Sequence, residues 1–196
     1  MALAEVAGCA SSAGMGQQIE AEQFTFGEET PVGKRVLVGY ATRTGSTTGV
    51  AEAIGRTLGE RGYVVDVRPL RERPSAADYD ACVIGSAING AVWLPEAASW
   101  VESAALALGE RPVAVFCVYS MNGGSDEKQT RKRLAYLDRV RALVTPAAEG
   151  FFLGKGPTAA DTSLIARWAF KAFGGTAEGD ARDWEKIRAW AEGLAL

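Results

Sequence analysis

Six consecutive residues, Thr42-Arg43-Thr44-Gly45-Ser46-Thr47, form a hydroxyl-rich loop between an apolar stretch and a helical pattern. Gly45 allows close approach of the backbone to a ligand, and the hydroxyls can donate hydrogen bonds. A helix that begins here adds free N–H groups and a favourable dipole, which together suit a phosphate group. The dipole contributes only about 0.3–1 kcal/mol when exposed, so hydrogen bonds must supply most of the affinity.

Other chemistries are excluded by the residues that are missing. The chain has no histidine, which rules out Ser-His-Asp triads, Cys-His pairs and histidine-based metal sites. Its three cysteines, Cys9, Cys82 and Cys117, are far apart and form no C-x-x-C pair. Cys82 and Cys117 lie in apolar runs and are predicted to be core residues. We therefore predict no catalytic side chain and no metal site, so that the chemistry falls to a bound cofactor.

The bulk composition favours one globular domain. The chain has 196 residues, of which 47% are hydrophobic and 23% charged, enough for one well-buried core. The net charge of -3 comes without an extended Lys/Arg block, which argues against nucleic-acid binding. No run of apolar residues reaches the roughly 18 needed to span a bilayer.

From Lys34 onwards, short apolar runs alternate with helical patterns, which is typical of a parallel sheet covered by helices. The predicted strands are Arg35–Tyr40, Tyr63–Leu70, Ala81–Ser86, Val113–Val118 and Phe151–Leu153. The predicted helices are Thr47–Arg61, Pro95–Leu108, Asp126–Val144 and a last one that begins near Asp183. On the third helix, Leu134, Leu137, Val140 and Val144 mark the expected buried stripe.

Five strands with intervening helices fit a flavodoxin-like α/β fold, a three-layer sandwich with a parallel sheet of order 2-1-3-4-5. Ligands of such sheets bind beyond the carboxyl ends of the first and third strands. The loops after Tyr40, Ser86 and Val118 are therefore the expected binding loops.

The loop Thr42–Thr47 matches the T/S-x-T-G-x-T fingerprint of flavodoxins, and it is neither a P-loop nor a G-x-G-x-x-G dinucleotide loop. From Arg35 onwards the chain resembles flavodoxin-domain proteins related to menaquinone-dependent protoporphyrinogen oxidase, a long-chain flavodoxin. The resemblance rests on TRTGSTTGVAEAIG, on GSAI followed by W-L-P-E-A, and on the closing motif from Gly174 to Trp184. It implies FMN as cofactor. The segment Asn89-Gly90-Ala91-Val92 departs from the aromatic and basic residues of the haem enzyme.

The resemblance also implies which residues surround the flavin ring. Ala87, Ile88, Asn89 and Gly90 would contribute backbone groups beside it, and Trp93 would either stack on the ring or pack its loop onto the following helix. The other side would be closed by Tyr119, Ser120, Met121, Asn122 and Gly123.

Two segments are predicted to lie outside the regular fold. Residues 1–33 lack periodicity and are expected to be a flexible tail before a domain of residues 34–196. Within the tail, Val6-Ala7-Gly8-Cys9 resembles the end of a bacterial lipoprotein signal, with Cys9 lipidated. Only eight residues precede Cys9, whereas a secretory signal needs a basic region and about 7–15 apolar residues. Either the signal has been trimmed or the match is accidental, so the location stays open between the cytoplasm and a membrane-anchored extracytoplasmic site.

The second segment is an insertion, Gly154–Arg182, between the last strand and the last helix. Its centre, Leu164–Phe173, has Arg167 and Lys171 on one face of an amphipathic helix. Such a helix either lies on a membrane or receives a quinone, or it simply packs on the domain.

Three functions are compatible with these features. The first is an FMN-binding redox protein that passes electrons to a partner protein or a quinone. The second is a quinone-dependent protoporphyrinogen IX dehydrogenase. The third is a flavodoxin-like interaction module without FMN.

Overall fold

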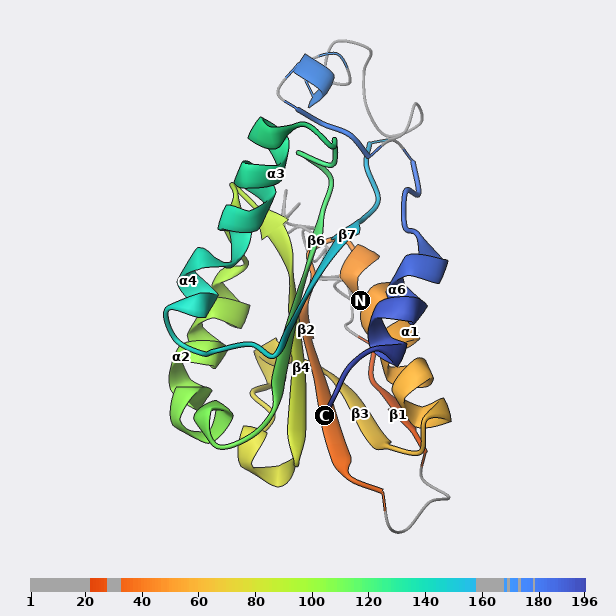
Figure 1. Ribbon diagram of the computed structural model, residues 1–196, viewed down its shortest axis with the longest axis vertical. Helices are drawn as coiled ribbons and strands as arrows, with labels where there is room; N and C mark the ends of the chain where they lie inside the picture. The colour runs from red at the N-terminus through yellow and green to blue at the C-terminus, as the bar shows by residue number, and fades with distance from the viewer. Residues whose placement is uncertain (1–21, 28–32, 158–167, 169, 173, 178) are drawn as a thin grey trace, which may run out of the picture.

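The computed structural model describes residues 22–27, 33–157, 168, 170–172, 174–177 and 179–196. They form a seven-stranded sheet with helices on both faces (Figure 1). The strands are β1 (Phe24–Phe26), β2 (Arg35–Ala41), β3 (Val64–Pro69), β4 (Ala81–Asn89), β5 (Val92–Trp93), β6 (Val113–Tyr119) and β7 (Ala148–Leu153). The helices are α1 (Ser46–Glu60), α2 (Pro95–Gly109), α3 (Glu127–Leu134), α4 (Asp138–Arg141) and α6 (Trp184–Glu192), with short 3₁₀ turns at Leu70–Glu72, Ala76–Asp78 and Ala135–Leu137.

Five strands pair in parallel in the order β3-β2-β4-β6-β7. Counted along the chain, these five strands have the predicted order 2-1-3-4-5. All residues of β6 and all but the first of β2 are buried, as expected of central strands that are covered on both faces. The α/β flavodoxin-like fold is confirmed.

Helices α1 and α6 cover one face of the sheet, and α2, α3 and α4 cover the other (Figure 1). The buried stripe of α1 includes Val50, Ile54 and Leu58, as its spacing predicts. Helix α6 begins after Asp183, whose carboxylate accepts a hydrogen bond from the Lys186 N–H at 3.0 Å and so caps the helix. The two faces hold separate hydrophobic cores, which pack against both sides of the strands that carry the binding loops.

The prediction that residues 1–33 lie outside the domain is wrong for one segment. Phe24–Phe26 instead forms the edge strand β1, antiparallel to β3. The pattern was missed because three residues in a polar segment give too short a periodicity to recognise. Most of the remaining predicted tail, including Cys9, lies outside the described residues.

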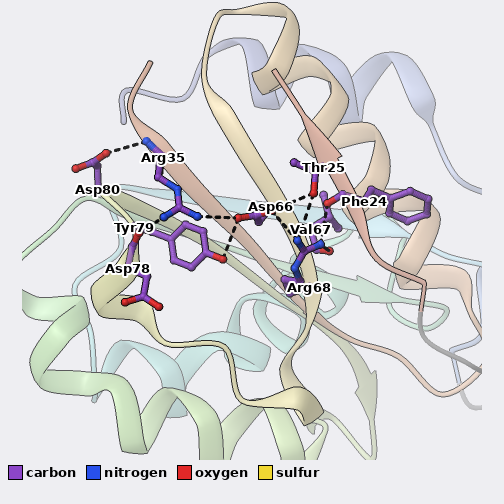
Figure 2. Close-up of polar contacts among 9 residues, drawn as sticks. All are labelled: Phe24, Thr25, Arg35, Asp66, Val67, Arg68, Asp78, Tyr79 and Asp80. Atoms are coloured by element: carbon purple, nitrogen blue, oxygen red, sulfur yellow. Dashed lines mark hydrogen bonds and ion pairs between the residues drawn. The ribbon is translucent and has the colours of Figure 1, made fainter. Parts of the chain in front are cut away.

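A polar cluster around Asp66 of β3 holds this edge together (Figure 2). The Asp66 carboxylate accepts hydrogen bonds from Thr25 on β1 at 3.1 Å and from Arg68 at 2.7 Å. It also accepts from Arg35 on β2 at 3.2 Å and from the Tyr79 hydroxyl at 3.1 Å. Asp66 is 8% exposed, and four donors satisfy the buried charge.

The helix predicted over Asp126–Val144 is not continuous. It breaks into α3, a 3₁₀ turn at Ala135–Leu137, and α4. The tighter turn shifts the register of the buried face, so that Tyr136 and Leu137 are buried while Leu134 is 44% exposed.

Cys82 and Cys117 are free thiols buried within the neighbouring strands β4 and β6, as predicted. Burial raises the pKa of the Cys82 thiol to about 12 and also raises the pKa of Cys117. Among the described residues, no helix is long and apolar enough to cross a membrane.

Candidate functional site

The hydroxyl-rich loop connects β2 to α1 at the carboxyl end of the sheet. Gly45 takes the N-cap position with φ of 78°, in the left-handed region that favours glycine. Its N–H donates a hydrogen bond to the Thr42 hydroxyl at 3.0 Å, which closes the turn. Thr42 and Gly45 thus shape the loop, and Ser46 and Thr47 lie at the start of the helix, where backbone N–H groups have no intrahelical acceptor.

Thr47 has a buried hydroxyl oxygen that makes no hydrogen bond with the described residues. An orphaned buried hydroxyl carries a cost of about 1–3 kcal/mol. Thr47 lies on the wall of a cavity at the N-terminus of α1, where a phosphate oxygen would accept a hydrogen bond from its hydroxyl. The donor set of the loop therefore fits a phosphate ester.

Ser46 links this loop to a segment that the sequence did not associate with it. Its hydroxyl oxygen accepts a hydrogen bond from the backbone N–H of Lys155 at 3.0 Å. A Cβ added to Gly154 would lie 2.8 Å from the same oxygen, so that glycine permits the close approach. Lys155 and Gly154 line the cavity together with the loop.

The closing motif Gly174–Trp184 lies next to Lys155. Lys155 forms an antiparallel bridge with Asp180, and Asp180 pairs with Arg182 at 2.5 Å. The hydrogen bond from Arg182 lowers the pKa of Asp180 to about 2. Arg182 stacks on the Trp184 ring at 4.4 Å and lies so close to α1 that a Cβ on Gly49 would be 2.6 Å from its guanidinium. The motif therefore supports the first turn of α1.

Two adjoining cavities open at the strand ends. The first has a volume of about 230 Å³. The second has about 570 Å³, within the range of roughly 300–1,000 Å³ of small-molecule sites. Four residues, Ile88, Asn89, Tyr119 and Ser120, line both. The first is completed by Arg43, Thr44, Ser46, Thr47, Ala87, Leu94, Val118, Gly154 and Lys155, and the second by Gly90, Ala91, Met121, Asn122, Lys132, Ala135 and Tyr136.

The wall after β4 is a tight hairpin, where the sequence predicted a loop. Ile88 pairs with Trp93 and Asn89 with Val92. The turn residues Gly90 and Ala91 have φ of 60° and 66°, which is the geometry that a two-residue hairpin turn needs. Ala91 carries a Cβ in this conformation, at a cost of about 1–2 kcal/mol.

The wall after β6 is held by hydrogen bonds to the closing motif. The N–H of Asn122 donates to the carbonyl oxygen of Gly174 at 2.8 Å, and the N–H of Gly123 donates to the Thr176 hydroxyl at 2.9 Å. The Asn122 side chain donates to the Tyr136 hydroxyl at 2.7 Å. Burial raises the pKa of Tyr119 to about 12, so its hydroxyl is neutral at physiological pH.

Most of the predicted site residues line the two strand-end cavities, with four exceptions. Thr42 and Gly45 set the loop geometry, and Gly123 faces a separate small cavity beside Arg133 and Lys186. Trp93 is 5% exposed and packs in the core with residues of α2. Of its two predicted roles the structure supports packing, because Trp93 lines neither of the two strand-end cavities.

Four residues that line the first cavity, Leu94, Val118, Gly154 and Lys155, were not among the predicted site residues. A glycine directly after the last parallel strand was the signal that could have indicated Gly154 and Lys155. Most of the predicted helix Leu164–Phe173 lies outside the described residues, although Trp168 is described and is 74% exposed. The described residues contain no cluster of three or more potential metal ligands.

Comparison with known proteins agrees with this geometry. The family model described as Flavodoxin domain matches residues 37–158, a range that contains the hydroxyl-rich loop and both walls. No curated protein matches the chain.

Among solved structures, the chain is similar to a flavodoxin from the domain Archaea, with 15% identity, a TM-score of 0.50 and coverage of 81% of this chain and 94% of that chain. It is also similar to the Streptococcus pneumonia TIGR4 flavodoxin, with 17% identity, a TM-score of 0.52 and coverage of 82% and 97%. A third match, rubredoxin oxygen:oxidoreductase from Desulfovibrio gigas, has 16% identity and a TM-score of 0.51, and covers 85% of this chain and 36% of that one. These likenesses concern the fold.

Proposed function

Because the chain belongs to the flavodoxin domain family, we propose that its strand-end cleft binds FMN and that the protein transfers electrons through this flavin to or from a redox partner. One observation carries the proposal above all others. The Thr47 hydroxyl is buried on the wall of a cavity at a helix N-terminus and has no hydrogen-bond partner among the described residues, which is the arrangement that a bound phosphate would complete.

In this proposal the first cavity holds the phosphate. Thr44, Ser46 and Thr47 supply hydroxyl donors, and the start of α1 supplies N–H groups and the positive end of its dipole. Arg43 and Lys155 line the same cavity and add positive charge. Gly45 leaves the approach open, because nothing lies within 4 Å of the position that a Cβ would take.

The second cavity takes the ring. Its walls are the β4–β5 hairpin and the loop after β6, both held by the contacts described above. These walls orient the ring and exclude water from one side. The flavin, when bound, supplies the redox chemistry, and the chain needs no catalytic side chain of its own.

Titration of the protein with FMN and with riboflavin, which lacks the phosphate, tests the proposal. We expect Thr44→Ala with Thr47→Ala to weaken FMN binding at least about tenfold, since each hydrogen bond to a charged group contributes about 1.5–3 kcal/mol. Riboflavin binding should be unchanged by the same substitutions. Quenching of flavin fluorescence gives both dissociation constants.

Thr57→Val is the matched control, because the Thr57 hydroxyl donates to the Ala53 carbonyl at 2.9 Å within α1, away from the cavity. It should leave the dissociation constant for FMN unchanged. A protein that stays colourless and does not quench flavin fluorescence would rule out the proposal.

The oxidation of protoporphyrinogen IX with a quinone acceptor is the narrower alternative. It rests on the resemblance of the closing motif Gly174–Trp184, whose described residues contact α1 and the loop after β6 and line neither strand-end cavity. Turnover of protoporphyrinogen with menadione, measured against free FMN, separates the two activities. A rate well above that of free FMN would favour the enzyme.

A further inference from the structure

The helical segment from α3 to α4 lies at the mouth of the second cavity. Lys132, Ala135 and Tyr136 line that cavity. Ala135 and Tyr136 also line a shallow apolar groove between this segment and α2, together with Val92, Arg139 and Leu143. The segment therefore forms one surface that runs from the proposed ring site to the groove.

This surface is basic in a chain that is acidic overall. Residues 127–141 contain six Lys or Arg and two acidic side chains, whereas the whole chain has a net charge of -3. Both acidic groups are neutralised within the segment: Glu127 pairs with Arg131 at 2.6 Å, and Asp138 pairs with Arg141 at 2.9 Å.

Three cationic side chains of the segment are available to a binding partner. Lys128, Lys132 and Arg139 are exposed, and they make no ion pair with the described part of the chain. Lys128 and Lys132 are four positions apart on α3, which is the spacing of one helical face. Lys132 borders the second cavity and Arg139 borders the groove.

The groove adds apolar surface between the charges. Val92 is 42% exposed and Leu143 is 40% exposed. Glu102 of α2 is the acidic residue that lines the groove. Apolar area with a charged rim is the usual composition of a transient protein interface, and electron-transfer interfaces are among the smallest of these.

We propose that the face formed by Lys128, Lys132, Arg139, Val92 and Leu143, here called the basic face, is the docking surface for an acidic redox protein. The inference rests on the proposed function, since it requires a flavin in the second cavity to exchange electrons with the partner. Opposite charge steers the partner and brings its redox centre to the ring edge. One electron then passes from the reduced centre of the partner to the flavin, with no bond made or broken in the protein.

A plant-type [2Fe–2S] ferredoxin, which is an acidic protein, serves as the probe. Its binding to the immobilised full chain is measured by surface plasmon resonance, and its reduction of the FMN-loaded protein is followed by stopped-flow absorbance. We expect Lys132→Glu with Arg139→Glu to weaken binding and slow electron transfer by about tenfold or more at low salt. The wild-type rate should fall steeply with ionic strength.

Arg56→Glu with Arg188→Glu is the matched control, since it makes the same change of charge on α1 and α6, across the sheet. It should change binding and rate by less than about twofold. Equal losses of ferredoxin binding in both double variants, or no loss in either, would contradict the assignment of the basic face as the docking surface. So would a wild-type protein that binds vesicles of phosphatidylglycerol and not the ferredoxin.

The two proposals fail in different ways. The plasmon resonance signal reports docking with or without flavin, and the absorbance of bound FMN reports the cofactor. A colourless protein whose ferredoxin binding still depends on Lys132 and Arg139 would remove the redox function and leave the docking surface.

Discussion

At the residue scale, the Thr47 hydroxyl has opposite effects on the stability of the fold and on the affinity for a ligand. This hydroxyl is buried and makes no hydrogen bond with the described residues, so without a ligand it lowers the stability of the fold. Buried polar groups without partners are uncommon in native structures, and functional sites are one place where they occur.

We expect Thr47→Val to act with opposite signs on the two properties. Valine keeps the shape and removes the orphaned oxygen, so the free protein should gain about 1 kcal/mol in its free energy of unfolding. The FMN complex should lose affinity. Urea unfolding of the flavin-free protein measures the first effect and fluorescence titration the second, with Thr57→Val again as control. A loss of stability in the free protein would contradict this account.

Sequence alone could predict the residues that we propose to bind phosphate, because their spacing after a strand and before a helix is local information. Lys155 could not be found in this way, since a backbone hydrogen bond to Ser46 across 109 positions brings it to the loop. The two roles of Trp93 could not be separated either, because its burial depends on the hairpin that turns it towards α2.

At the scale of elements, the β4–β5 hairpin is the part of the site with stored strain. Ala91 adopts φ of 66°, and strained residues of this kind are often found at ligand sites. The hairpin places Gly90 and Ala91 on the wall of the second cavity.

Replacing Ala91 with glycine should therefore raise the free energy of unfolding by up to about 1 kcal/mol, because glycine adopts this conformation without steric cost. The control is Ala189→Gly on the exposed side of α6, where the same change should lower stability by about 1 kcal/mol. Both are measured by urea denaturation. Two changes of the same sign would mean that the backbone at Ala91 is unstrained.

The parallel strands and α1, α2 and α6 could be predicted because each combines a continuous apolar run or stripe with clear end signals. The pair Asn89-Gly90 is typical of a two-residue hairpin turn and could have indicated the hairpin, although the turn residues are Gly90 and Ala91. The break after α3 depends on tertiary packing of Tyr136 and Leu137, which helical periodicity does not report.

At the scale of the whole molecule, the Asp66 cluster joins β1 to the domain. Thr25, Arg35 and Arg68 come from three strands and converge on one carboxylate (Figure 2). Strand β1 also covers the edge of β3, and an uncovered edge strand invites pairing with other chains.

We expect Asp66→Asn to lower the free energy of unfolding by about 1–3 kcal/mol, because the amide cannot accept from four donors and loses the charge. The amides of Phe24–Phe26 should exchange faster with deuterium. Asp80→Asn is the control: Asp80 is exposed and accepts from the Arg35 N–H at 2.7 Å, so its loss should be smaller. Unchanged exchange in β1 would show that the strand is held by other contacts.

The burial of the two thiols in β4 and β6 affects how readily the protein is oxidised. Reduced flavins react with oxygen, and the hydrogen peroxide that results oxidises cysteine through its thiolate. Cys82 and Cys117 are enclosed by the sheet and stay protonated, so they present no thiolate to that peroxide. In the part of the chain that the structure describes, burial and protonation thus protect both cysteines from oxidation of this kind.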